Sequence, residues 1–314
     1  HLDTRINVDI EVRVEGDEMT VDFSDIASQV DGPLNSGVAG GAITAARVAF
    51  KYLATPEEPA NDGAFRPLKI VIPDGKFLSA DKTAPMGSYS APLPTVIDTI
   101  MKAMASAVPD RVAAGHHGTF TVHVFQGRHP ETGELYQDLE TGHGGWGALQ
   151  GMDGPGPFKT MAHGDTLDVP AEVEEALYPL RIRTMTMRRD SCGHGEFRGG
   201  LGVERVYEAL APCILTVAVE RTTCPAWGLH GGLEGTPPEI VVERATGESR
   251  VVLKDSLPLQ PGDVVRVLSG GGGGFGSPLK RDPARVAQDV RAGYVSPEAA
   301  RSFYGVVVDA DGAV

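Results

Sequence analysis

The chain has 314 residues, of which 41% are hydrophobic and 22% charged, and its formal net charge is −14. This composition is typical of a globular protein and excludes a fibrous or disordered one. The sequence has no basic stripe of the kind that nucleic-acid binders carry, and no apolar run approaching the roughly 18 residues of a membrane span. Its three cysteines form no CxxC motif, which favours reduced thiols in a cytoplasmic protein.

The first predicted element is a β-hairpin. Apolar and polar residues alternate from Ile6 to Val14, which predicts a half-buried strand; Gly16-Asp17 then turns the chain, and residues 19–25 supply the second strand. An isolated hairpin is marginally stable in water. The chain opens at His1 already in this pattern, so we expect a preceding polypeptide to cover the edge of the first strand.

Two helices are predicted in the first third of the chain. Small and apolar residues over 37–54 predict a packed helix that Ser36 could cap. Residues 94–108 predict a second helix, with Pro94 near its first turn and apolar residues on one face. A short strand over residues 68–72 separates them.

The rest of the chain is predicted to be rich in strands. Loop residues dominate 127–157, and 171–177 predict a short helix. In the tail, Asp282-Pro283 and Ser296-Pro297 each supply a helix N-cap followed by proline. The predicted strands are 119–125, 180–187, 203–210, 214–219, 240–243, 251–254 and 264–268.

Because strands dominate and seldom alternate strictly with helices, we predict an α+β fold. It should contain strand-rich mixed sheets, a few packed helices, and long loops rich in the 40 glycines and 23 prolines. We expect a core over residues 1–278, which could be subdivided near 165–180, and a helical tail over 279–314.

The densest polar segment runs from Arg188 to Gly200. Cys192 and His194 stand two residues apart, on one side of an extended chain, so they could form a nucleophilic pair or two metal ligands. The glycines could instead form an anion-binding nest. The plainer interpretation is a structural turn in which Asp190 caps backbone amides and the arginines pair with acids.

Two further segments carry imidazoles. His116 and His117 stand between glycines ahead of a strand; at most one should face a site, and a surface loop is the favoured interpretation. His143 lies in a glycine-rich loop with Trp146, which either lines a site or packs as an omega loop.

The five glycines from Gly270 to Gly274 are neither a Walker A loop nor a dinucleotide fingerprint, because the required residues and spacing are missing. Asn61-Asp62-Gly63 with Arg66 predicts a turn with a salt bridge, although Asn61 and Arg66 could face a substrate. We take Asp190, His194 and His117 as candidates for catalysis. The candidates for substrate binding are Asn35, Asn61, Arg66, His143 and Arg198.

These segments, taken together and in order, resemble the hydantoinase B/oxoprolinase family, which also includes acetone carboxylase subunits. The family usually has a small residue where Cys192 and His194 stand, which argues against Cys192 as a nucleophile. The matching motifs are 21–24 with 32–35, 61–67, 109–113, 144–148 with 153–154, 189–200, and 270–308.

The resemblance implies one component of a two-component enzyme. An A-type ATPase subunit would use ATP and Mg to phosphorylate an oxygen of a small-molecule substrate, and the B-type component would complete hydrolysis or carboxylation. Family members are usually near twice this length. The resemblance therefore implies that an N-terminal half of the B-type subunit is absent here, and that this half holds most of the ligands of a divalent metal.

Three functions are consistent with the resemblance. The first is the B component of an ATP-dependent cyclic-amide hydrolase of the hydantoinase, lactamase or oxoprolinase type, inactive alone. The second is a component of a ketone carboxylase of the acetone or acetophenone type. The third is a scaffold subunit without catalytic groups. Neither nucleic acid nor a membrane is an expected partner.

Overall fold

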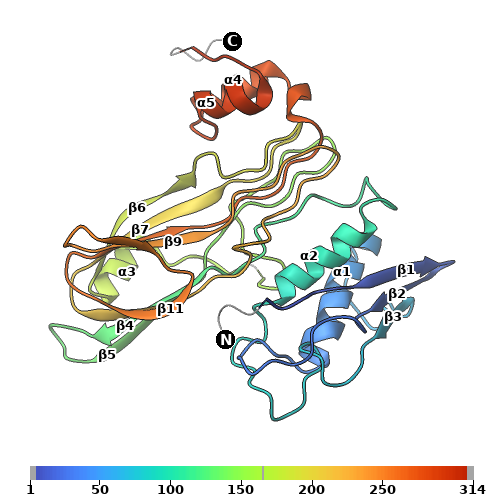
Figure 1. The fold of residues 1–314 in the computed structure, drawn as a ribbon, viewed down its shortest axis with the longest axis horizontal. Coiled ribbons are helices and arrows are strands. Elements are labelled where there is room, and N and C mark those ends of the chain that lie inside the picture. Colours follow the sequence, from blue (N-terminus) through green and yellow to red (C-terminus); the bar gives the residue numbers. More distant parts are fainter. Residues whose placement is uncertain (1–4, 165, 310–314) are drawn as a thin grey trace. The chain divides into compact units, whose positions relative to one another are not determined.

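The structure is a computed structural model that describes residues 5–164 and 166–309. Its chain divides into two compact units, His1–Ala113 and Ala114–Val314, called unit 1 and unit 2 below. Figure 1 shows the elements of each unit. The predicted core over 1–278, its possible subdivision near 165–180 and the predicted tail over 279–314 stay predictions.

Unit 1 combines a small sheet with two main helices. In its described residues the strand order is β1-β2-β3, with β1 antiparallel and β3 parallel to β2. Helix α1 packs on helix α2. The elements are β1 (Glu11–Glu15), β2 (Glu18–Asp22), a π-helical turn (Ala39–Ile43) leading into α1 (Thr44–Ala54), β3 (Leu68–Val71) and α2 (Leu93–Met104).

The hairpin and both helices of unit 1 are confirmed, with two corrections. The first strand begins at Glu11, so the alternation from Ile6 to Ile10 does not form a strand. Ser36 does not cap the first helix: the residue at that position is Val38, and the Ser36 hydroxyl has no hydrogen-bond partner among the described residues.

Unit 2 contains two sheets in its described residues, ordered β10-β9-β12-β7-β6 and β11-β8-β4-β5. All strand pairs within these two sheets are antiparallel. The strands and the one intervening helix are β4 (Val122–Arg128), β5 (Leu135–Glu140), α3 (Ala171–Leu177), β6 (Leu180–Arg188), β7 (Gly202–Ala209), β8 (Cys213–Ala218), β9 (Glu239–Glu243), β10 (Ser249–Val251), β11 (Lys254–Leu259) and β12 (Val264–Leu268).

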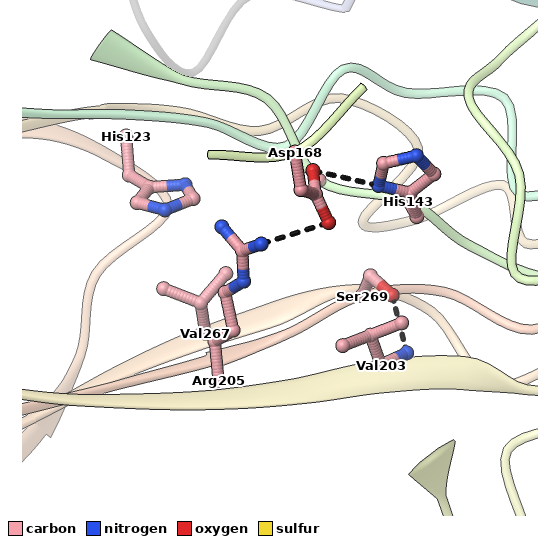
Figure 2. A pocket seen from close by; sticks show the side chains of 8 residues that line it. His123, His143, Asp168, Val203, Arg205, Val267 and Ser269 are labelled. Atoms are coloured by element: carbon pink, nitrogen blue, oxygen red, sulfur yellow. Dashed lines mark hydrogen bonds and ion pairs between the residues drawn. The ribbon is translucent and has the colours of Figure 1, made fainter. Parts of the chain in front are cut away.

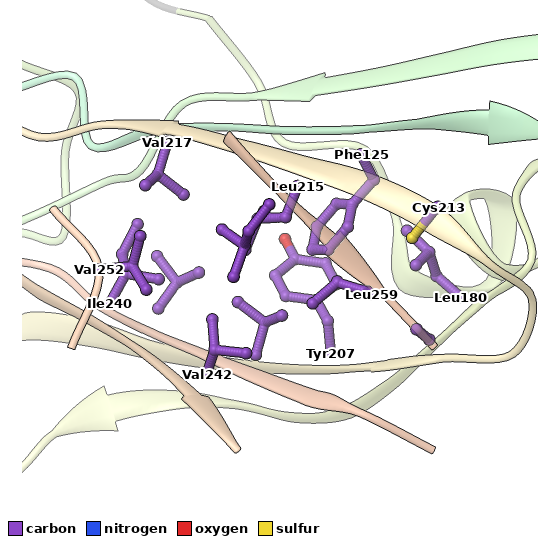
Figure 3. Close-up of a cluster of buried hydrophobic side chains, with 14 of the residues drawn as sticks. Phe125, Leu180, Tyr207, Cys213, Leu215, Val217, Ile240, Val242, Val252 and Leu259 are labelled. Atoms are coloured by element: carbon purple, nitrogen blue, oxygen red, sulfur yellow. The ribbon is translucent and has the colours of Figure 1, made fainter. Parts of the chain in front are cut away.

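The core of unit 2 lies between these two sheets (Figure 3). Tyr207 from β7 and Ile240 from β9 meet Phe125 from β4 and Leu215 from β8, and all four side chains are fully buried. Alternating residues point to one face of a strand, so strands such as β8 and β9 contribute every second side chain to this core. We call this part of unit 2 the sandwich.

A second part of unit 2 is made of extended segments that belong to neither sheet. We call it the glycine bundle; its segments are 114–117, 144–158, 191–200, 226–236 and 269–276. Gly271, Gly272 and Gly273 donate their amides to three different segments, at Thr236, Gly200 and Gly115. A strand in a sheet forms hydrogen bonds only with the strand on each side of it. The segment 269–276 forms them with three different segments, so the hydrogen bonds of the bundle do not lie in one plane.

The end of the chain forms short helices that pack on the bundle through a cluster around Cys192, Val286 and Tyr304. Both predicted N-caps are confirmed: Asp282 accepts from the amide of Ala284, and Ser296 from the amide of Ala299. The helices are a 3₁₀ turn (Pro278–Lys280), α4 (Pro283–Arg291), α5 (Pro297–Ala299) and a π-helical turn (Ala300–Tyr304). Among the described residues, none of the helices combines the length and the apolar character needed to cross a membrane.

Candidate functional site

A small pocket opens in unit 2 where the sandwich meets the glycine bundle. Its cavity volume is about 10 Å³, which leaves room for about one water molecule. Figure 2 shows the side chains that converge on it, with Val203, Val267 and Ser269 on one side and His143 and Asp168, from the loops that follow β5, on the other. Its lining residues are His123, Gly142, His143, Asp168, Val203, Arg205, Val267 and Ser269.

His143 and Asp168 form a dyad at the mouth of this pocket. His143 Nδ1 lies 3.0 Å from Asp168 Oδ1, and about a fifth of each side chain is exposed. A hydrogen bond there places the imidazole proton on Nδ1, which leaves Nε2 able to accept or deliver a proton. Burial alone would raise the pKa of Asp168, but the hydrogen bond from His143 and the charges of Arg205 and Lys159 lower it to about 2.

Two cations fix Asp168 from the inner side. Arg205 Nη2 lies 2.8 Å from Asp168 Oδ2, and Lys159 Nζ lies 3.2 Å from Oδ1. Arg205 also pairs with Glu140 at 3.3 Å. Both cationic side chains are buried, and a buried charge must be paired to be tolerated. The dyad therefore has a rigid electrostatic support.

His123 closes the inner end of the pocket as a neutral ring. Its Nε2 lies 3.1 Å from the Tyr207 hydroxyl and its Nδ1 lies 3.0 Å from the Thr121 carbonyl. Burial lowers the pKa of His123 to about 4. It is therefore a packing and hydrogen-bonding group at neutral pH.

Three predicted site residues lie away from this pocket, against the C-terminal helices. The Asp190 side chain accepts a hydrogen bond from the Ser296 amide at 2.7 Å. This amide belongs to the tail, whereas we expected Asp190 to accept from several amides of its own loop. Arg198 Nε lies 3.0 Å from Asp289. His194 stacks on Phe303 and lies 3.0 Å from the hydroxyl of Tyr304. These contacts attach the tail to the bundle, and the proposed catalytic and binding roles stay predictions.

The burial of Cys192 argues against the nucleophilic role that the sequence left open for it. The side chain is 2% exposed, and burial raises the pKa of the thiol to about 12. A thiol with this pKa is not a thiolate at neutral pH and lacks the reactivity of a nucleophile. His194 has its own pKa lowered to about 4 by burial, so it is neutral beside Tyr304.

The expected surface position of the adjacent histidines is wrong. His116 and His117 are each 1% exposed, because residues 114–117 form one segment of the glycine bundle. His117 Nε2 lies 3.2 Å from the Phe158 carbonyl. Burial, together with the neighbouring His116, lowers the pKa of His117 well below its usual value, so the ring is neutral.

The remaining predicted residues belong to unit 1. Asn35 is fully buried and bonds only to backbone groups among the described residues, including the Val30 amide and carbonyl. Asn61 accepts from the Ala64 amide in an exposed turn that also carries Arg66. The expected salt bridge of this turn joins Asp62 to Arg47, at 3.3 Å. Their roles toward a substrate stay predictions.

Sequence reasoning missed the residues that surround His143. Lys159 and Asp168 lie in the irregular stretch within 25 residues of His143, Arg205 lies in a later strand, and no local motif marks any of them. The one available signal was an arginine at an inward position of a predicted strand, because such a residue needs acidic partners.

The residues present do not form a complete metal site. Within the part of the chain that the structure describes, no three histidine, cysteine, aspartate or glutamate side chains are grouped so that they could hold a metal ion. His143 and Asp168 could supply two ligands at most. A metal of the kind that the family resemblance implies would need ligands from another polypeptide segment.

The comparisons with known proteins agree with this fold. A family model described as hydantoinase B/oxoprolinase matches residues 1–278. The chain belongs to this family. It is 31% identical to the B component of a putative D-/L-hydantoinase of Pseudomonas sp. (strain NS671), over 98% of the chain and 52% of that protein.

Solved structures of the family have the same architecture. The ATP-dependent caprolactamase of Pseudomonas jessenii superposes with a TM-score of 0.85 and 28% identity, covering 96% of this chain and 54% of that one. The beta component of this caprolactamase is 31% identical by sequence, over 98% of this chain and 54% of that polypeptide. The predicted α+β fold is thereby confirmed.

An acetone carboxylase structure also matches, with a TM-score of 0.83, 21% identity, and coverage of 97% of this chain and 46% of that one. At this identity the likeness shows the fold alone. The chain spans about half the length of the curated relatives it matches.

Proposed function

We propose that the chain is part of the B component of an ATP-dependent cyclic-amide hydrolase. The family match over residues 1–278 carries this proposal, and the likeness to a caprolactamase supports it. In this proposal ATP and Mg are bound by an A-type partner subunit, which phosphorylates the amide oxygen of the substrate. The rest of the B-type polypeptide supplies most of the ligands of a divalent metal, and the assembly works in the cytoplasm.

The pocket at His143 is the place where this chain would contribute to the chemistry. Water adds to the carbon of the phosphorylated ring and the ring C–N bond breaks, so that the nitrogen leaves as an amine that carries the protons of the water. The acyl phosphate that remains is hydrolysed by a second water to a carboxylate and inorganic phosphate. His143, with Nδ1 held by Asp168, would use Nε2 to take a proton from the water and return one to the nitrogen. Phosphorylation of the amide oxygen makes the ring carbon electrophilic enough for this step.

The experiment uses the 314-residue chain together with the subunits that co-purify with it. We expect ring opening of a hydantoin, a lactam or 5-oxoproline to consume ATP, and the chain alone to show neither ATPase nor hydrolase activity. His143→Ala should lower kcat by about 100-fold or more, within the usual contribution of a general acid–base group. His129→Ala, in the exposed β4–β5 turn, is the matched control.

The other two functions are outcomes of the same experiment. Substrate-dependent ATP consumption that requires bicarbonate would mean a ketone carboxylase, for which the present support is fold likeness alone. Full activity of the assembly with His143→Ala and with Asp168→Asn would mean that this chain is a scaffold at this site.

A further inference from the structure

Strand β5 places acidic side chains where a core strand usually places apolar ones. Asp138 and Glu140 point inward and are 3% and 6% exposed, whereas Leu135 and Leu139 point outward and are 78% and 55% exposed. β5 lies at the edge of its sheet. Carboxylates in such a place need partners inside the unit.

The inner face of β5 meets helix α3 through Glu174. This side chain is fully buried, and within the described residues no N–H or cationic group donates to either of its oxygens or to Asp138 Oδ2. The Glu174 carboxyl group instead has the Asp138 carboxyl group as its neighbour, and each raises or lowers the pKa of the other. Two carboxylates are acceptors only, so the pair can form a hydrogen bond only if one of them carries a proton.

A charge count also leaves this pair of carboxyl groups without a cation. Asp138, Glu140, Asp168 and Glu174 meet two cations, Arg205 and Lys159, which are committed to Glu140 and Asp168. No cation is left for the remaining pair among the described contacts. The titratable and charged groups around the pair are Tyr136 and Glu140 on β5, Arg205 and Tyr207 on β7, and Tyr178 after α3.

The position of α3 links this pair to the pocket. Residues 166–170, which contain Asp168, lead directly into α3. Asp168 in turn holds His143 at 3.0 Å. A contact that fixes α3 against β5 therefore also fixes the carboxylate of the dyad.

We propose that Asp138 and Glu174 share one proton and act as a latch that holds α3, and with it Asp168, in place. When the proton is lost, two adjacent buried carboxylates repel each other. Helix α3 then separates from β5, which is what we mean by the opening of the latch. The consequence for turnover rests on the function proposed above, whereas the latch itself is a property of this chain alone.

The direction of the pH dependence follows from the carboxyl environments. Burial and the charge of Asp138 raise the pKa of Glu174 to about 8, while burial and Glu140 raise that of Asp138 to about 6. The folded chain thus keeps a proton that the unfolded chain loses near its ordinary pKa of 4.5. The free energy of unfolding should therefore be greatest below pH 4.5 with respect to this group, and should fall as the pH rises to about 8.

The test compares Glu174→Gln with the full wild-type chain. Glutamine keeps the shape and a donor to Asp138 but cannot lose a proton. At pH 7 the infrared spectrum of the wild type should contain the carbonyl stretch of a protonated carboxyl group, and E174Q should lack it. Glu172→Gln, an exposed position on the same helix, is the matched control and should keep the band.

Hydrogen exchange measures the opening of the latch. At pH 9, about one unit above the pKa of Glu174, the amides of α3 should exchange about tenfold more slowly in E174Q than in the wild type, after correction for intrinsic rates. Asp138→Asn, which donates to Glu174 in the same way, should behave alike. In the active assembly, turnover above pH 8 should fall less steeply for E174Q.

Several outcomes would overturn the latch. One is the absence of the protonated-carboxyl band from the wild type at pH 7, which requires no variant to fold. Another is identical pH dependence of α3 exchange in wild type and E174Q. A third is a loss of thermal stability with EDTA in the wild type but not in E174Q, because that would mean a cation between the carboxylates. None of these needs a substrate, so they decide the latch even if the proposed function fails.

Discussion

The sandwich and the glycine bundle of unit 2 are held together by opposite means. In the sandwich, side chains such as Leu215 and Tyr207 fill the space between two sheets. In the bundle, backbones approach so closely that no side chain fits: a Cβ on Gly272 would lie 2.0 Å from the Trp146 carbonyl oxygen. The stability of the sandwich depends on the volume of its apolar side chains. The stability of the bundle depends on glycines, because a side chain would keep the backbones apart.

This difference explains where the polar side chains gather. A bundle of glycine backbones contributes little apolar surface, so its margins are fixed by charged and hydrogen-bonding groups such as Arg281 and Asp153. The pocket with His143 and Asp168 lies where one type of packing gives way to the other. Functional side chains can stand there because neither region needs that space for its own core.

The largest effect is expected in the bundle. Gly272→Ala should destabilise the chain by more than about 4 kcal/mol, or prevent folding, because the new methyl group meets backbone atoms that cannot move aside. Gly37→Ala, with nothing within 4 Å of the added atom, should change stability by less than about 1 kcal/mol. Urea unfolding measures both; a cost for Gly272→Ala similar to that of Gly37→Ala would disprove backbone packing.

The sandwich should tolerate a comparable change better. Leu215→Ala removes apolar volume at a fully buried position of β8 and should cost about 3 kcal/mol without loss of the fold. Its exposed neighbour Ile214→Ala should cost less than about 1 kcal/mol. If Leu215→Ala proved as damaging as Gly272→Ala, the contrast between the two regions would not hold.

The margin of the bundle should respond to loss of charge. Arg281 is buried and bonds both oxygens of Asp153, at 2.7 and 2.9 Å, and one oxygen of Asp289, at 2.7 Å. Arg281→Met should cost about 2–3 kcal/mol, because both carboxylates keep one other cation. Arg285→Met, at a partly exposed pair, should cost less than about 1 kcal/mol. If thermal unfolding showed the same loss of stability for Arg281→Met and Arg285→Met, the buried position of Arg281 would have no particular importance.

Much of the sandwich could be predicted from the sequence, because its strands keep a regular alternation. The predicted strand over 203–210 is β7, displaced by one residue, and both tail helices begin at the predicted caps. Strand β5 was missed and assigned to a loop, because its inner face is acidic and its outer face carries leucines. An inverted pattern of this kind reveals a strand only once α3 and Arg205 are known to lie behind it.

The pocket and the bundle could not be derived from local patterns. The pocket depends on side chains brought together from distant segments, and of these only His143 was predicted. The run from Gly270 to Gly274 was correctly excluded as a phosphate loop, but its structural role was not recognised. Five adjacent residues without side chains are a signal that backbones approach from several sides, and this signal carries over to other glycine-rich chains.

The smallest effect concerns Cys192, where the tail helices add side chains to the bundle. Its thiol packs in the cluster with Val286 and Tyr304 and has a pKa of about 12 because it is buried. Cys192→Ser should therefore cost about 1–2 kcal/mol, for a hydroxyl placed in apolar surroundings, and leave the activity of the assembly within about twofold of wild type. Exposed Cys224→Ser should change neither quantity. Thermal unfolding and turnover of the same preparations give the answer. Inactivation by Cys192→Ser at an unchanged melting temperature would restore the thiol as a nucleophile, and with it a chemical role for the bundle itself.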